Sequence, residues 1–189
     1  MALLEPVFAQ AGAPFALVGH SYGGAVALLA ALQRPERLRA LVLYEPTLFA
    51  LVDAATPPPN AADGIRHTVT RATAALAAGN PADAAAIFID YWMGEGAFAA
   101  KPEAQRGAIQ GAVTHVQGWG SALFGEPTPL EAFAGLQVPV LLMQGHDTTP
   151  SARAVGTLLA RVLPRLETLT FDGLGHMGPI THPALVDAT

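Results

Sequence analysis

The stretch Leu17-Val18-Gly19-His20-Ser21-Tyr22-Gly23-Gly24-Ala25-Val26-Ala27-Leu28 decides how this chain folds. The apolar run from Phe15 to Val18 just ahead of its turn predicts a short buried strand. A Gly-x-Ser-x-Gly turn follows, and an Ala- and Leu-rich segment with helical character then continues to Pro35. The order of strand, tight turn and helix gives the five-residue pattern a structural context that a chance match lacks.

The turn predicts an unusual position for Ser21. A serine at the apex of so sharp a turn is pushed outward in a strained backbone conformation. Gly19 and Gly23 are expected to leave room for the strand and the helix to approach each other. The first amides of the helix point at the Ser21 hydroxyl, where negative charge would develop during attack on a carbonyl. The pattern favours a nucleophilic serine, and the alternative is a Gly-rich turn with an inert one.

Composition limits the class of protein. A chain of 189 residues, 51% hydrophobic and 13% charged, is typical of one compact core rather than of a disordered segment. A net charge of −5 without a basic run argues against a nucleic-acid partner, and no apolar run is long enough to span a bilayer. The absence of Cys excludes disulfides, and no Lys or Arg precedes Arg34. We therefore expect a cytoplasmic protein without a secretory signal.

The rest of the chain alternates strands and helices at both ends and is helical in the middle. Near-continuous apolar runs joined by helices imply a parallel sheet covered on both faces. Between these ends, the Pro-rich segment 56–60 predicts a stiff linker and the segment after it is Ala-rich. Strands are expected over residues 15–18, 38–44, 138–144 and 166–171. Besides the helical segment that ends at Pro35, helices are expected over residues 3–11, 61–79, 81–92, 102–116 and 150–163.

Arranged in this order, the motifs resemble those of the α/β-hydrolase family. The serine turn comes first, then a strand running into Tyr44-Glu45-Pro46, a helical insertion, a strand ending at Gly145-His146-Asp147, and a loop with Gly175-His176. The resemblance covers residues 1–189. It implies an α/β fold with a parallel sheet made of the family's fifth to eighth strands. It also implies a hydrolase core in residues 1–49 and 135–189 and a helical cap, or lid, in residues 50–134.

The chain departs from the family at its start. The family's first four strands, and the loop that supplies one oxyanion-hole amide, have no counterpart in the sequence. This leaves Phe15–Val18 as an unpaired apolar strand edge, which favours association. Two interpretations stay open: the chain is a fragment of a longer protein, or it forms a homodimer through this edge. Loss of one oxyanion donor costs about 10²–10³ in turnover, so the truncated chain is expected to be a poor catalyst.

The resemblance also implies a catalytic triad. Ser21 would be the nucleophile, His176 its base, and the Tyr22 amide an oxyanion donor. Two residues are candidates for the acid. Asp147 lies where most members of the family carry it, although its loop is shorter than usual. Glu45 ends the strand after the elbow, where haloalkane dehalogenases and similar relatives carry a Glu. The alternative role for Glu45 is that of a buried structural carboxylate bonded to loop amides.

Apolar side chains of the insertion suggest a substrate pocket. Trp92, Phe98, Trp119 and Phe124 would line an acyl pocket, or pack as the core of the lid. His20 is expected to line the pocket too, because it cannot turn back to serve as the base of Ser21. Arg66 is expected on a solvated helix face. No two histidines have metal-ligand spacing, so we expect neither a metal nor an organic cofactor.

The sequence therefore predicts a serine hydrolase acting on an ester or related acyl bond of a small apolar substrate, through an acyl-enzyme. A first alternative is a non-catalytic ligand-binding or scaffold protein that keeps the fold. A second is a cofactor-free perhydrolase, or haloperoxidase, which uses the same triad with peroxide in place of water.

Overall fold

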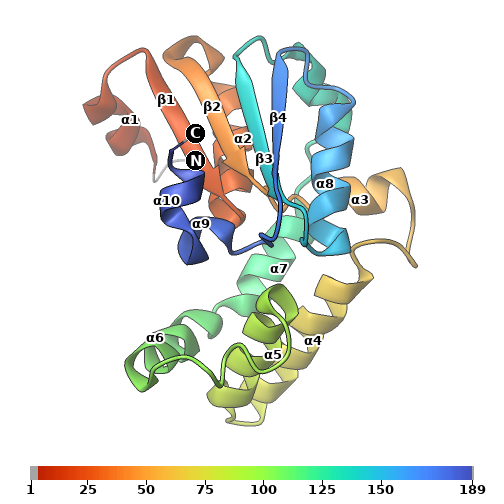
Figure 1. The fold of residues 1–189 in the computed structure, drawn as a ribbon. Coiled ribbons are helices and arrows are strands. Elements are labelled where there is room, and N and C mark those ends of the chain that lie inside the picture. The colour runs from red at the N-terminus through yellow and green to blue at the C-terminus, as the bar shows by residue number, and fades with distance from the viewer. Residues whose placement is uncertain (1–3, 189) are drawn as a thin grey trace.

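A single parallel sheet forms the centre of the protein (Figure 1). The computed structural model describes residues 4–188. Its four strands, β1 (Phe15–His20), β2 (Leu38–Tyr44), β3 (Val140–Gly145) and β4 (Leu166–Phe171), pair in the order β1-β2-β3-β4. All three pairings are parallel. The α/β class and the parallel sheet predicted from the sequence are confirmed.

The helices outside the long β2–β3 connection flank the sheet. Leu3, which we expected in the first helix, lies outside the described residues. A 3-10 turn, η2 (Pro35–Arg37), leads into β2, and another, η3 (Leu130–Gly135), precedes β3. The helices of this part are α1 (Glu5–Ala11), α2 (Tyr22–Gln33), α8 (Pro150–Ala160), α9 (Gly178–Thr181) and α10 (Pro183–Val186).

The long connection between β2 and β3 is helical. We call α4 to α7 the helical layer; they lie beyond the lower end of the sheet in Figure 1. No helix in residues 4–188 is long and apolar enough to cross a membrane. The helices of this connection are α3 (Ala50–Ala55), α4 (Asp63–Ala77), α5 (Pro81–Met93), α6 (Glu103–Val113) and α7 (Val116–Gly125).

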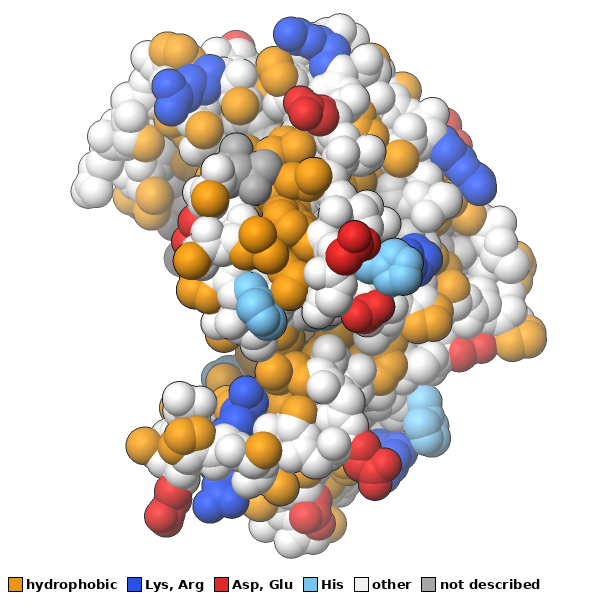
Figure 2. Space-filling view, viewed as in Figure 1, with side chains coloured by type: hydrophobic (Ala, Val, Ile, Leu, Met, Phe, Trp, Pro, Cys, Tyr) orange, Lys and Arg blue, Asp and Glu red, His pale blue; other side chains and the backbone are white. Residues whose placement is uncertain are grey.

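The two faces of the sheet differ in how well they are covered. Leu41, Leu43 and Leu142 are buried in the main core, together with residues of α2 and α8. On the opposite face, Val42 is only partly buried, and Val18 of β1 is 72% exposed. Figure 2 views the molecule from the same side as Figure 1 and shows hydrophobic side chains gathered at the surface over the strands. Helices therefore cover one face closely and leave part of the other open.

The register of the sheet sets up the site. His20 at the end of β1 lies beside Tyr44 at the end of β2, and Tyr44 in turn lies beside Met143 of β3. Because all strands are parallel, the loops that follow them begin at one edge of the sheet. The loops that carry Ser21, Glu45, Asp147 and His176 all start at this edge.

Candidate active site

The turn after β1 holds Ser21 in a strained conformation. Ser21 has φ 55° and ψ −121°, a region that non-Gly residues rarely occupy. A Cβ on Gly19 would lie 2.5 Å from the carbonyl oxygen of Gly23, so only glycine fits at position 19. A Cβ on Gly23 would meet nothing within 4 Å, whereas one on Gly24 would lie 3.1 Å from Cα of Pro46. Our expectation of crowding is therefore confirmed at Gly19 and wrong at Gly23.

Ser21, His176 and Glu45 form a continuous hydrogen-bonded line. The Ser21 hydroxyl lies 2.8 Å from Nε2 of His176. Nδ1 of His176 lies 2.7 Å from Oε2 of Glu45. The carboxylate accepts from Nδ1–H, so the neutral ring keeps Nε2 free to accept the serine proton. His176 and Glu45 are each 1% exposed, and their pair is shielded from water.

Glu45 lies in a set of donors that orient both of its oxygens. Its backbone has φ 44°, which directs the chain out of β2 at a left-handed residue. The amide of Gly145 donates to Oε1 at 2.8 Å, and the Thr148 hydroxyl donates to Oε2 at 2.6 Å. Bonds of this kind to a carboxylate are shorter and stronger than bonds between neutral groups. Glu45 is thus both bonded to a loop amide and in contact with the imidazole.

Asp147 is not brought to His176. Its carboxylate lies 3.0 Å from Nδ1 of His146, and its side chain is 63% exposed. Its backbone amide donates to the Leu174 carbonyl oxygen at 2.8 Å, which ties the loop after β3 to the loop after β4. Of the two candidate acids, Glu45 is the one that the structure places at the imidazole.

Two side chains hold the backbone around His176. Nε2–H of His20 donates to the His176 carbonyl oxygen at 2.7 Å, and the Tyr44 hydroxyl donates to the Gly175 carbonyl oxygen at 2.9 Å. Burial and the neighbouring His176 ring lower the pKa of His20 from 6.5 to about 4, against the opposing effects of that hydrogen bond and of Glu45. Burial, followed by the Glu45 charge, raises the pKa of Tyr44. Both groups are therefore neutral at pH 7.

The backbone amide of Tyr22 follows Ser21 directly. Tyr22 is the first residue of α2, and the first amides of a helix have no partner within it. The positive end of the helix dipole also lies here. Residues 4–188 contain no group of three or more His, Asp or Glu side chains that could hold a metal ion.

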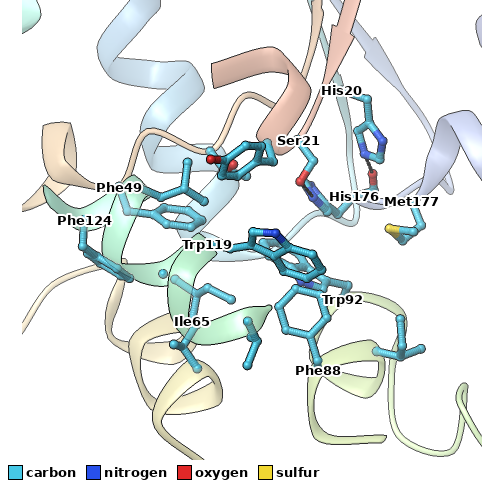
Figure 3. Close-up of a pocket in the computed structure, with 17 residues that line it drawn as sticks. His20, Ser21, Phe49, Ile65, Phe88, Trp92, Trp119, Phe124, His176 and Met177 are labelled. Carbon is cyan, nitrogen blue, oxygen red and sulfur yellow. Dashed lines mark hydrogen bonds between the residues drawn. The ribbon is translucent and has the colours of Figure 1, made fainter. Parts of the chain in front are cut away.

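A cavity of about 340 Å³ opens beside the serine. Figure 3 shows His20, Ser21 and His176 at one side of it, with Phe49, Ile65 and Phe124 at the other. Most of its lining is apolar and comes from the helical layer. Phe98 does not line it and packs in a separate cluster with Val113 and Val116. The aromatic residues that line the cavity are Tyr22, Phe49, Phe88, Trp92, Trp119 and Phe124, beside His20 and His176.

Some of these contacts cannot be predicted from the sequence. Thr148 stands directly after Asp147, and no local pattern indicates its contact with Glu45. The contact between His20 and the His176 carbonyl joins residues 156 positions apart, so no local pattern could reveal it. Both contacts depend on which strands become neighbours.

Comparison with known proteins gives a family and a partial relative. A family model described as the alpha/beta hydrolase family matches residues 2–189. Lipase LipV of Mycobacterium tuberculosis is 37% identical over 79 residues, a match that covers 38% of this chain and 30% of LipV. The chain thus matches less than a third of the length of this curated relative.

Solved structures share the fold over nearly the whole chain. An alpha/beta hydrolase from Sphaerobacter thermophilus is 27% identical with a TM-score of 0.61, and the match covers 98% of this chain and 70% of that one. Carboxylesterase CesB from Bacillus subtilis is 20% identical with a TM-score of 0.66, and the match covers 98% of this chain and 61% of CesB. At 20% identity, the second likeness speaks for the fold alone.

Proposed function

Because this chain belongs to the alpha/beta hydrolase family, we propose that it is a serine hydrolase that cleaves an ester or related acyl bond of a small, largely apolar substrate. The observation that carries the proposal is the line from Ser21 through His176 to Glu45 at the wall of an apolar cavity. The name of one relative, a lipase, favours the same class of reaction.

In the proposed first step, Ser21 Oγ attacks the substrate carbonyl carbon while its proton passes to Nε2 of His176. Glu45 keeps the other ring nitrogen protonated and faces the positive charge that the ring acquires. The carbonyl oxygen becomes an oxyanion, and the Tyr22 amide at the start of α2 donates to it. Collapse of this intermediate transfers the proton from Nε2 to the leaving alcohol and leaves an acyl group on Ser21.

In the second step, water takes the place of the alcohol. His176 removes a proton from the water as it attacks the acyl-enzyme, and then returns the proton to Ser21 Oγ. The products are an acid and the free enzyme. We assign the acid of the triad to Glu45 rather than to Asp147 because only Glu45 contacts Nδ1 of His176.

We further propose that the helical layer acts as a cap over the substrate. Ile65 of α4, Trp92 of α5 and Trp119 of α7 line the cavity together with His20 and Ser21 at the edge of the sheet. Enclosing the reacting bond between the two layers would exclude water from it and favour apolar acyl groups.

We also propose that the chain forms a homodimer through the edge strand β1. This strand ends the sheet, and Val18 is exposed on it. An apolar strand edge of this kind favours pairing with a second copy. Light scattering coupled to size exclusion should give the mass of a dimer for the chain and that of a monomer for Val18→Lys. A monomeric chain would remove this part of the proposal and leave the chemistry intact.

A fluorophosphonate probe tests the chemistry directly. The activated serine should attack the phosphorus and retain the adduct, which peptide mass spectrometry locates at Ser21. Ser21→Ala provides the control, and p-nitrophenyl butyrate provides an independent assay of turnover. A folded protein that neither reacts with the probe nor turns over esters, yet is stabilised against heat by apolar ligands, would instead be a ligand-binding protein.

A further inference from the structure

Trp92 makes a second contact besides lining the cavity. Its indole ring stacks on the imidazole of His176, with ring centroids 3.8 Å apart and planes inclined by 25°. Trp92 is 8% exposed and His176 1%, so the two rings meet without water between them. Figure 3 draws both residues among those that line the cavity.

We propose that Trp92 is a positioning residue for His176. The indole of Trp92 packs against one face of the imidazole and stabilises the imidazolium form through a cation–π contact. The proposal rests on the proposed function, because the imidazolium is the state that forms when Ser21 gives up its proton. The face of an indole ring attracts cations more strongly than that of any other side chain.

The geometry around the imidazole leaves this task to Trp92. Ser21 and Glu45 contact the two ring nitrogens and therefore lie near the ring plane. Neither residue packs against a face of the imidazole ring. The indole covers one face, and the nearest other ring, that of His20, has its centroid 5.0 Å away at a tilt of 46°. His20 is neutral, so among these rings the indole is the one with an electron-rich face against the imidazole.

Trp92 is itself held in place from both layers. Its neighbour Tyr91 meets it edge to face at 4.7 Å, and the Tyr91 hydroxyl shares a 2.8 Å hydrogen bond with the Ser151 hydroxyl of α8. Phe88 meets the indole edge-on at 6.3 Å. The end of α5 is thus tied to α8 beside the sheet, and the indole is presented to His176 by this junction.

A substitution at position 92 removes no titratable group from the surroundings of His176. Among residues 4–188, Glu45 is the one carboxylate in contact with the ring, and Asp147 faces His146 instead. A difference between variants at position 92 therefore reports on the indole. The titratable groups around the His176 loop and the indole come from several elements. They are Tyr44 at the end of β2, Glu45 directly after it, His20 of β1, Tyr22 of α2, Tyr91 of α5 and Asp147 after β3.

The proposal is tested by the direction in which the midpoint of the His176 titration shifts when Trp92 is replaced. Nitrogen NMR follows the titration of the His176 ring, whose signals are assigned by their loss in His176→Gln. A cation–π contact between buried groups is worth about 5- to 30-fold in the protonation equilibrium, so the midpoint should fall by about 0.7 to 1.5 pH units from wild type to Trp92→Leu. Trp92→Phe should lie between them.

The opposite direction would overturn the proposal. If Trp92 only shields the ring from water, its replacement lets water in and favours the charged form, and the midpoint rises. An unchanged midpoint overturns it equally. Trp119→Leu is the matched control, because Trp119 lines the same cavity and has no ring contact with His176. Its midpoint should equal that of the wild type, whatever happens to KM.

A second experiment avoids any change of shape. The chain has two Trp residues, so fluorotryptophans incorporated into the Trp119→Phe protein alter Trp92 alone. Fluorine atoms withdraw electron density from the ring face, and each further fluorine should lower the midpoint. A midpoint that does not change with the number of fluorine atoms would overturn the proposal, even if Trp92→Leu fails to fold. The titration needs no turnover, so an absence of fluorophosphonate labelling at Ser21 would refute the proposed function separately.

Discussion

Among single residues, Glu45 and Asp147 make the sharpest contrast. Glu45→Gln replaces the acceptor of the His176 Nδ1 proton with an amide that can favour the wrong tautomer, and turnover should fall about 10⁴-fold. Asp147→Asn changes an exposed carboxylate that faces His146, and turnover should stay within about threefold of the wild type. Hydrolysis of p-nitrophenyl butyrate measures both, with circular dichroism as a check on folding. Equal losses in the two variants would contradict the assignment of the acid.

His20 predicts a pH dependence of stability. Its pKa is about 4 in the folded protein and 6.5 when exposed, so the unfolded chain binds more protons between these values. Stability from neutral His20 is therefore complete above pH 6.5 and is lost as the pH falls toward 4. Between pH 7 and pH 4.5 the loss from this group is about 2–3 kcal/mol.

His20→Gln separates this contribution from acid unfolding in general. Glutamine keeps a donor for the His176 carbonyl but cannot titrate, so its free energy of unfolding should fall less than that of the wild type over the same pH range. Urea unfolding at pH 7 and pH 4.5 provides the comparison. Parallel losses in both proteins would show that His20 does not titrate as we expect.

The sequence predicts those site residues that lie in a distinctive local pattern. Ser21 and the His176 loop each follow a strand and are flanked by glycines, and such patterns are visible in the sequence. The choice between Glu45 and Asp147 was not visible, because both follow strands and carry the same charge. Only the packing of β2 beside β3, which brings Gly145 and Thr148 to the carboxylate, separates them.

At the scale of elements, the junction of β1 and α2 depends on Gly19. Gly19→Ala would place a methyl group 2.5 Å from the Gly23 carbonyl oxygen, and the backbone on either side must move. We expect a loss of about 2–4 kcal/mol in the free energy of unfolding. Gly23→Ala meets nothing within 4 Å and lies within α2, so it should be neutral or stabilising by up to about 1 kcal/mol.

Chemical denaturation of the two variants and the wild type checks this pair. Both variants replace glycine by alanine in the same turn, so the difference between them isolates the steric contact. A Gly19→Ala protein as stable as Gly23→Ala would mean that strand and helix are not pressed together at this turn.

Strands were easier to foresee than the helices of the long connection. The apolar run 38–44 predicted β2 with its observed bounds, because a strand buried on a sheet face needs such a run. Residues 166–171 form β4 with the expected bounds too, although only Phe171 of this strand is buried. The helix α7 was missed because Gly118 and Gly120 weaken the helical pattern. The structure supplies a reason for the second glycine: a Cβ there would lie 2.7 Å from Cγ1 of Val69, so Gly120 lets α7 approach α4.

Arg66 shows the same limit of local patterns. We expected it on a solvated helix face, but its guanidinium forms a 2.6 Å ion pair with Asp53 of α3 and lies over the Phe124 ring of α7, 4.2 Å from its centroid. The expectation holds only in part: the side chain is 38% exposed, but two elements on either side of the linker 56–60 meet α4 at this point. Nothing in the spacing along α4 indicates such partners.

For the whole molecule, the selectivity for acyl groups is expected to come from the meeting of two layers. One wall of the cavity is the edge of the sheet with Ser21, and the other consists of helices with Trp119 and Phe124 (Figure 3). Each methylene buried there contributes about 0.8 kcal/mol, so kcat/KM should rise about fourfold for each carbon added to an acyl chain. The rise should end when the chain fills the cavity of about 340 Å³.

Trp119→Ala enlarges this cavity from the side of the helices, and the optimum should move to longer acyl chains while short esters lose rate. A series of p-nitrophenyl esters of increasing length measures the profile. Phe98→Ala is the control, because Phe98 is buried in the same layer without lining the cavity. If both variants prefer longer chains, looser packing of the helical layer causes the change. If neither does, the acyl group binds outside this cavity, and the helices do not set the selectivity.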